Sequence, residues 1–221
     1  MNADLLQSLG VTLLLAAVTT LILLFIAPPL AWWLARTRHR SRPFFEALVA
    51  LPLVLPPTVL GFYLLLVMAG DGALGQFWIM LTGHSLAFTF AGLVIASVIY
   101  SLPFVSQPLT TSFRNTDETL LDAATLLGAS PMERFFRLIL PLHRRALIAA
   151  AVLGFAHTLG EFGIVLMIGG NIPGETRVLS ILLFDQVETL NYAVAHTTAF
   201  ILLSMSLAAL TLTYSTLGRN P

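Results

Sequence analysis

Five apolar runs, each close to the length that crosses a lipid bilayer, constrain this sequence more than any other feature. A helix needs roughly 20 predominantly apolar residues to span the hydrocarbon core. Only 10% of the residues are charged, against about 25% in soluble domains, so the folded chain must present its exterior to lipid. We therefore predict an all-α, polytopic membrane bundle, a single domain over residues 1–221. Its five predicted transmembrane helices cover residues 9–33, 44–68, 86–107, 146–168 and 193–214.

The positive charges predict the orientation of these spans. All eleven lysine-or-arginine positions are arginines. Ten of them lie in three regions, namely the 34–43 loop, the 108–145 stretch and the C-terminal tail with Arg219, and only Arg177 lies elsewhere. Cytoplasmic loops carry the excess of positive charge. We expect a periplasmic N-terminus and a cytoplasmic C-terminus in a bacterial inner membrane. The first run is a retained anchor rather than a signal peptide, because Asp4 precedes it and the arginines follow it.

Two residue types are missing, and each absence excludes a function. Without cysteine the chain has no disulfide framework and no thiolate metal site. Without lysine it has no Walker A loop, whose lysine reaches the nucleotide phosphates. If ATP drives the work of this chain, the ATPase is another polypeptide. We expect no enzyme activity, no cofactor and no nucleic-acid partner.

The segment 116–141 predicts two short helices that face the cytoplasm. Thr116 and the two acidic residues after it favour a helix start, and Gly128 suits the position just past a helix end. The sequence Ser130-Pro131-Met132-Glu133 fits a capping box with proline at the first helical position. A second helix should then run to about Leu140, where Pro141 should break it.

The same segment resembles the EAA motif of ABC importer permeases. That motif reads E-A-A, three residues, G, nine residues, I, one residue, L-P, and this chain matches its spacing throughout. Two positions differ conservatively, aspartate for glutamate and leucine for isoleucine. The matching residues are Asp122, Ala123, Ala124, Gly128, Leu138, Leu140 and Pro141.

The resemblance implies a type I importer permease with the MetI-like fold. In that family the segment docks in a groove of an ATP-binding subunit. One coupling segment per chain, with two ATPase copies to engage, implies a homodimer. A separate periplasmic binding protein would deliver the substrate.

Two further stretches resemble molybdate permeases. Residues 52–63 (PLVLPPTVLGFY) are similar to the second span of that group, and residues 159–163 with 170–174 are similar to its fourth span and the following outer loop. The resemblance implies transport of a tetrahedral oxyanion, most simply molybdate, with sulfate or tungstate as alternatives. The group commonly has arginine where this chain has His157.

Ionisable residues inside the spans are candidate functional groups, because they are costly in lipid. His157 and Glu161 are spaced one helical turn apart, so they should share one face. They would line the translocation path or its gate, together with Thr158 and Asn171. The open alternatives are a structural pair and a two-ligand metal site, although no further ligand is clustered with them. Glu46, near the start of the second span, is expected either to reach the membrane surface or to pair with a nearby arginine.

Other local features predict irregular structure. Pro52, Pro56 and Pro57 should bend the second span, which should then be largely covered by protein. The glycine-rich residues 69–85 are expected to form an outer loop. Residues 180–190 should form a short helix, with a shallow sixth span as the alternative.

Two other classes of protein were considered. A membrane-embedded enzyme would need a nucleophile together with a base, or a metal cluster, at one depth, and only the His157–Glu161 pair is available. A stand-alone carrier would need inverted repeats, and the sequence shows no clear internal repeat. No span contains an arginine or lysine. We therefore expect a weakly binding passage for the oxyanion, because release requires weak binding, and selectivity that comes from the periplasmic binding protein.

Overall fold

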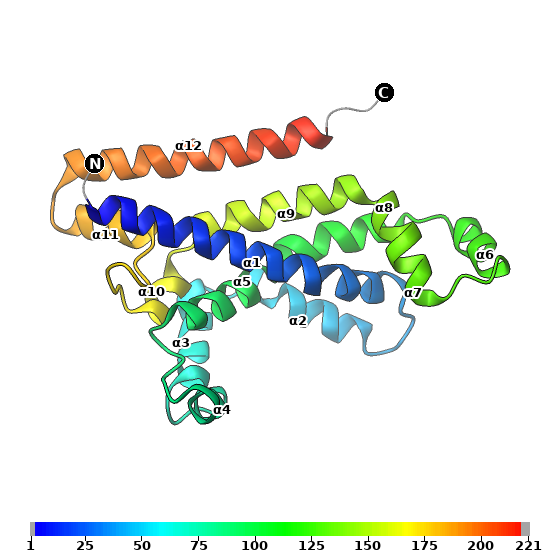
Figure 1. The fold of residues 1–221 in the computed structure, drawn as a ribbon, viewed down its shortest axis with the longest axis horizontal. Helices are drawn as coiled ribbons and strands as arrows, with labels where there is room; N and C mark the ends of the chain where they lie inside the picture. Colours follow the sequence, from blue (N-terminus) through cyan, green and yellow to red (C-terminus); the bar gives the residue numbers. More distant parts are fainter. Residues whose placement is uncertain (1–2, 218–221) are drawn as a thin grey trace.

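The computed structural model describes residues 3–217, and over that range it is helical without any β-strand (Figure 1). The predicted all-α class is confirmed. Arg219 lies outside the described residues. The elements are α1 (Ala3–Arg36), α2 (Arg42–Val54), α3 (Pro57–Met68), α4 (Ala73–Thr82), α5 (Phe90–Arg114), α6 (Glu118–Leu126), α7 (Pro131–Glu133), the π-helix η1 (Arg134–Ile139), α8 (Leu140–Leu142), α9 (Arg144–Leu159), α10 (Gly163–Gly169), α11 (Leu179–Glu188) and α12 (Tyr192–Leu217).

Helices α1, α5 and α9 pack against one another and form the centre of the bundle (Figure 1). Small residues lie where the helices approach. Ala27 and Ala31 of α1 are fully buried, and Gly154 of α9 faces Val105 of α5. Helices that pack in a membrane use such small residues because they let the backbones come close.

The apolar core has two main parts, one toward each end of the bundle. The first joins α1, α3, α5 and α10, and contains Met68, Leu93 and Ile164. The second joins α1, α5 and α9 with the π-helix, and there Ile139 is buried beside Phe113. This second part anchors the 116–141 segment to the bundle.

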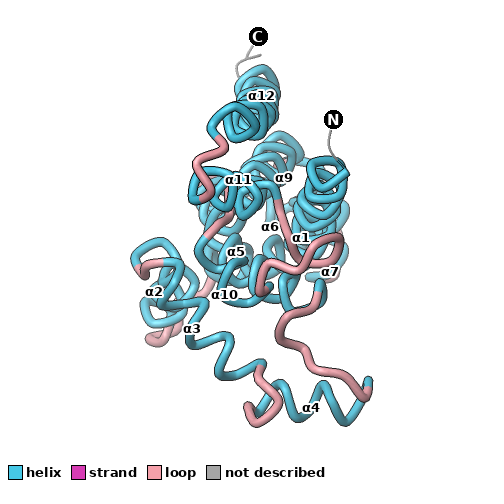
Figure 2. The backbone as a smooth tube through the Cα atoms, turned by 90° about the vertical axis from the view of Figure 1, so that its left-hand side faces the viewer, coloured by secondary structure: helices cyan, strands magenta, loops and turns pink. Residues whose placement is uncertain are grey.

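Three helices are long and apolar enough to cross a membrane, namely α1, α5 and α12. Two bent pairs bring the number to as many as five among the described residues. One pair is α2 with α3, bent by 112°, and the other is Pro131–Leu142 with α9, bent by 77°. Helix α12 lies at the edge of the bundle (Figure 2) and packs on α9 and α11.

The bend predicted for the second span is confirmed. Helix α2 ends at Val54 and α3 begins at Pro57, with extended backbone at Leu55 and Pro56 between them. The expected covering by protein is not met within one chain. Phe62 is 48% exposed and Tyr63 is 60% exposed, so this face of α3 is left for lipid or for another subunit.

The fourth apolar run, 146–168, is not one continuous helix, contrary to the prediction. Helix α9 ends at Leu159 and α10 begins only at Gly163. The chain leaves the helix at Gly160, and Phe162 has a non-helical backbone (φ −130°, ψ −65°). Within the break, Glu161 makes hydrogen bonds with Ser97 and Ser101 of α5, which lie far from it in the sequence.

Two outer segments were predicted with different success. The short helix expected at 180–190 is confirmed as α11, whose first amide, that of Leu179, donates to Thr12 Oγ1 of α1 at 2.8 Å. The prediction of a loop at 69–85 was wrong, because α4 occupies its middle. Its glycines belong to the helix ends: Gly72 is the N-cap, and Gly83 ends the helix with a positive φ of 76°.

Close packing at Gly154 gives a test of the bundle. A Cβ atom there would lie 2.6 Å from Val105 Cγ2, a buried and conformationally stiff side chain. We expect Gly154→Ala to destabilise the protein by about 1–3 kcal/mol, measured as a lower Tm in detergent. Gly160→Ala is the matched control, because the nearest atom to its Cβ is 3.8 Å away. Equal Tm values for the two variants would contradict this packing.

Candidate functional site

The 116–141 segment extends from one end of the bundle, where α6 forms its tip (Figure 1). Asp117 is the N-cap of α6, and its Oδ1 accepts from the Thr119 amide at 2.9 Å. These hydrogen bonds with Thr119 hold the pKa of Asp117 below its usual value. None of the residues of α6 is buried. The helix is therefore left uncovered by the rest of the chain, and its start is fixed locally.

Gly128 ends α6 in the way the sequence predicted. Its φ is +84°, a conformation that residues with a side chain rarely adopt. The Gly128 amide donates to the Thr125 carbonyl at 2.9 Å, and the Ala129 amide donates to the Ala124 carbonyl at 3.0 Å. This pair of bonds is a Schellman motif. Gly128 thus turns the chain sharply from the first short helix to the second.

The second helix begins with the predicted capping box. Ser130 Oγ accepts from the Glu133 amide, and the Glu133 carboxylate accepts from the Ser130 amide at 3.0 Å. The hydrogen bonds with Ser130 also lower the pKa of Glu133. A bond of 2.6 Å from Arg134 Nη1 to Thr125 Oγ1 ties this helix to α6.

Pro141 does not break the helix, contrary to the prediction. The chain widens into η1, where the Leu140 amide donates to the Phe135 carbonyl five residues back, and it continues as α8 to Leu142. The missing N–H of proline and the clash of its ring interrupt the ordinary four-residue pattern, and the wide turn accommodates them. The direction changes at His143 instead.

The EAA-like residues fall into an exposed group and an anchoring group. Asp122, Ala123 and Gly128 are exposed, and Ala124 with Leu138 helps to line a notch of about 310 Å³ between the two helices. Leu138 and Leu140 also pack on the bundle core. Beside the notch, the side chains of Leu126 and Leu127 are 89% and 88% exposed. These two leucines form an apolar surface that the rest of the described chain leaves uncovered.

Arg36 and His143 attach the segment to the bundle. Arg36 Nη2 donates to the Thr116 carbonyl at 2.9 Å, and the guanidinium lies over the Trp32 ring. His143 Nδ1 is 2.7 Å from Ser112 Oγ, and its Nε2 is 2.9 Å from Thr116 Oγ1. Burial, with a smaller contribution from the Arg36 charge, lowers the pKa of His143. A neutral imidazole thus links the bend before α9 to the end of α5.

A buried carboxylate lies at the break between α9 and α10. Glu161 is 3% exposed. Ser97 Oγ donates to its Oε2, and Ser101 Oγ donates to its Oε1 at 2.7 Å. The Glu161 carbonyl accepts a hydrogen bond from Ser180 of α11. Four segments therefore meet at this residue, and its polar groups are satisfied by protein rather than by water.

His157 and Thr158 join this carboxylate, as the sequence predicted for His157. The distance from His157 Nδ1 to Glu161 Oε1 is 3.6 Å, and Nδ1 is 2.8 Å from Ser101 Oγ. The single Ser101 proton goes to the carboxylate, so Nδ1 donates to Ser101. Thr158 Oγ1 lies 3.1 Å from the same hydroxyl. A chain of hydrogen bonds thus runs from the imidazole to the carboxylate.

The network borders a cavity of about 620 Å³. The His157 ring stacks on Phe104 at 3.7 Å between ring centroids, with Tyr100 at 4.8 Å. Thr58, from the start of α3, lines the opposite wall. Within the described residues, no three His, Cys, Asp or Glu side chains are grouped to hold a metal ion.

Asn171 is held in a different network. Its Nδ2 donates to Asp185 Oδ2 at 2.9 Å, and its Oδ1 accepts from Arg177 Nε at 2.7 Å. Its positive φ of 60° turns the chain after α10. The structure thus brings together His157, Thr158 and Glu161, while Asn171 organises the loop that leads to α11.

Sequence reasoning missed Ser97 and Ser101. Both are fully buried in α5, and together they bind both oxygens of Glu161. The sequence did contain a signal for this pair, because the two serines are four residues apart in an apolar span. This spacing puts both side chains on one face of the helix. Serines are common in membrane helices, so the pattern became informative only beside a carboxylate.

Comparison with known proteins decides the family. The model of the family described as "Binding-protein-dependent transport system inner membrane component" matches residues 24–217. The chain belongs to this family. It is therefore a multi-pass inner-membrane component of a transport system.

The relatives and solved structures agree with this membership. The molybdenum transport permease ModB of Azotobacter vinelandii is 56% identical over 86% of this chain and 84% of its own length. A probable sulfate permease of Zygnema circumcarinatum is 34% identical over 93% of the chain and 71% of its own length. A structure of the inward-facing MetNI methionine transporter matches with a TM-score of 0.69 and 16% identity. The match covers 98% of this chain and 99% of the transporter chain. The last match shows the predicted MetI-like fold.

The hydrogen bonds of Ser101 give a test of the carboxylate network. Ser101→Ala would leave Glu161 Oε1 without its hydroxyl donor in a buried position. We expect a loss of about 1–3 kcal/mol of stability, seen as a Tm lower by several degrees in detergent. Ser204→Ala, on the exposed side of α12, is the control. A Tm for Ser101→Ala equal to that of the control would show that the carboxylate does not depend on this bond.

Proposed function

We propose that this chain is the permease subunit of an ATP-driven importer that carries molybdate into the cytoplasm. The observation that carries the proposal is the 56% identity, over most of both chains, to the ModB permease of molybdenum transport. The ModB protein of Haemophilus influenzae, 35% identical over 83% of this chain, supports the same cargo. Sulfate is the second candidate, supported by the sulfate permease at 34% identity; tungstate is a further alternative.

The 116–141 segment is the proposed contact with the ATPase. Its exposed group presents Asp122, the small Ala123 and Gly128, and the apolar tip formed by Leu126 and Leu127. Small residues allow close approach of a partner, and the exposed leucines supply apolar surface for it to bury. Leu138, Leu140 and Pro141 form the other half of the motif and join this tip to the bundle. Two copies of the chain would engage two ATPase subunits.

The proposed orientation places this segment in the cytoplasm. The arginine-rich end of the bundle holds Arg36, Arg114 and the 134–145 stretch, and the opposite end holds the N-terminal turn of α1 and α11 (Figure 1). Five spans then connect the two sides if the bent α2–α3 pair is one span and α9 is another, beside α1, α5 and α12. The substrate would arrive from a periplasmic oxyanion-binding protein at the α11 end.

Helix α9 connects the two candidate sites mechanically. It begins after His143, at the bend next to the coupling segment, and ends at Leu159, next to the Glu161 network. A displacement of the coupling segment therefore reaches the α9–α10 break through one rigid helix. His157, Thr158 and Glu161 are the proposed gate, beside the cavity that Tyr100 and Thr58 line.

The membrane-embedded part of the passage would interact weakly with an anion. The Glu161 carboxylate repels an oxyanion. The hydroxyls bound to this carboxylate hold the carboxylate itself in place. Such a passage allows conduction without trapping the ion. Discrimination between oxyanions would come from the periplasmic binding protein.

Uptake by whole cells tests the cargo. A strain that lacks its own molybdate and sulfate permeases would express this chain with its ATPase and binding protein. We expect molybdate uptake that tungstate competes with and that excess sulfate affects little. Sulfate uptake without molybdate uptake would establish the second candidate instead. Cells that express the ATPase and binding protein alone are the control.

Gly128 provides the test of coupling. A side chain added at Gly128 meets nothing within 4 Å, and the same is true at Gly83, which also has a positive φ (+84° and +76°). Valine at either position therefore imposes similar backbone strain, of about 1–2 kcal/mol. We expect Gly128→Val to abolish ATP-driven uptake and Gly83→Val to retain most of it, at equal amounts of each protein in the membrane. Equal uptake by the two variants would contradict the coupling role.

A further inference from the structure

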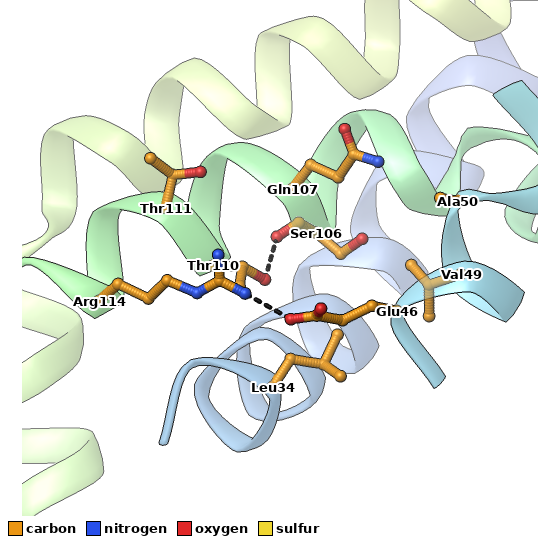
Figure 3. Close-up of a pocket in the computed structure, with 9 residues that line it drawn as sticks. All are labelled: Leu34, Glu46, Val49, Ala50, Ser106, Gln107, Thr110, Thr111 and Arg114. Carbon is orange, nitrogen blue, oxygen red and sulfur yellow. Dashed lines mark hydrogen bonds and ion pairs between the residues drawn. The ribbon is translucent and has the colours of Figure 1, made fainter. Parts of the chain in front are cut away.

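A second pocket lies between α1, α2 and α5 near the arginine-rich end of the bundle. Its volume is about 290 Å³. Three apolar residues, Leu34, Val49 and Ala50, form part of its wall (Figure 3). The remaining lining is polar or charged and comes mostly from the last turns of α5. Those residues are Glu46, Ser106, Gln107, Thr110, Thr111 and Arg114.

The pocket lining holds one arginine and one glutamate, and Arg42, which contacts this glutamate from outside the lining, makes the charged cluster positive. Arg114 Nη2 pairs with Glu46 Oε1 across the pocket (Figure 3), and Arg42 Nε donates to the same oxygen at 3.0 Å. Two guanidinium groups share one carboxylate, so the three side chains carry a net charge of +1. A guanidinium has five N–H donors. Arg114 therefore keeps donors for an anion while it stays bound to Glu46.

Ser106 is an unused hydrogen-bonding group in the pocket. Its side chain is fully buried and lines the pocket, and its Oγ has no hydrogen-bond partner. An unpaired hydroxyl in a buried position is costly. Its neighbour Thr110 is already occupied, because its Oγ1 donates to the Ser106 carbonyl at 2.7 Å (Figure 3). The Ser106 hydroxyl is thus a donor that a bound ligand would satisfy.

The pocket lies on the same face of α5 as the cavity beside Glu161. Tyr100 lines that cavity, and Gln107 and Arg114 line this pocket. Positions seven residues apart fall within about 20° of one another around a helix. Tyr100, Gln107 and Arg114 therefore form one line along α5, about 21 Å long at 1.5 Å per residue. Both hollows also border the bent α2–α3 pair.

We propose that this pocket is a binding site for a tetrahedral oxyanion, where the cargo pauses before it enters the cytoplasm. Arg114 supplies charge-assisted donors, Ser106 supplies the buried hydroxyl, and Gln107 and Thr111 supply further polar contacts. Glu46 limits the affinity, because its carboxylate repels the anion while it holds the two arginines together. The site rests on the proposed function for the identity of the cargo, and it adds an exit position to the passage.

Direct binding by the full-length chain tests the proposal. The protein would be purified in a maltoside detergent, which carries no phosphate, and titrated with molybdate or sulfate while the molybdenum NMR line width or the heat of binding is measured. We expect saturable binding weaker than micromolar. Arg114→Gln and Ser106→Ala should each weaken it, by about tenfold for Arg114→Gln because a charge-assisted bond is lost. Glu46→Gln should tighten it several-fold, because the local charge rises from +1 to +2.

The controls separate this site from general charge and from lipid. Arg40→Gln removes the same charge from an exposed loop position outside the pocket and should leave binding unchanged. Tm values show whether each variant is folded. Equal binding by the Arg114→Gln and Arg40→Gln variants, or no tightening in Glu46→Gln, would overturn the proposal. Binding of phosphatidylglycerol to these residues in place of the free ions would also overturn it.

The cell uptake assay distinguishes failure of this site from failure of the proposed function. If wild-type cells import molybdate but the purified variants all bind it alike, the exit site is wrong and the transport function stands. If the purified chain binds sulfate and the cells import sulfate alone, the site stands and the cargo is corrected.

Discussion

The carboxylate of Glu161 is the group on which much of this structure depends. In a bilayer no water is available to form hydrogen bonds with a charged side chain or with the free backbone groups at a helix break. Other groups of the protein must therefore form these hydrogen bonds. Ser97 and Ser101 bind the two carboxylate oxygens, and Ser180 binds the backbone carbonyl of the same residue. These bonds fix α5, α9 and α11 relative to one another. They also allow the chain to leave the helix at Gly160 in the middle of an apolar run.

The break gives α9 two defined ends, each held by side-chain contacts. At one end His143 contacts Ser112 and Thr116 beside the 116–141 segment. At the other, His157 reaches the Glu161 network. A helix held by side-chain bonds at both ends moves as a unit. The turn of the 116–141 segment is itself closed by a Schellman motif, formed by the backbone bonds of Gly128 and Ala129.

Charge is distributed so that binding stays weak along the proposed passage. The spans predicted from the sequence hold Glu46, Glu161 and two histidines but no arginine, and most of the arginines gather at one end. There, Glu46 neutralises one of the two guanidinium groups that contact it. An anion that moves from the Glu161 cavity to this end goes from a repelling environment to a mildly attractive one.

The sequence by itself determined the all-helical membrane fold, the two capped helices of the 116–141 segment and the bend of the second span. Those features depend on local signals: apolar run length, a capping box, a glycine at a helix end and prolines in a row. The tertiary structure decided four other features. These are the partners of Glu161, the break after Leu159, the helix within 69–85 and the continuation of the helix past Pro141. Each of them depends on groups far apart in the sequence or on a change of helical register. Ser97 is 64 residues from Glu161, and no local pattern states that the two will meet in a place from which water is excluded.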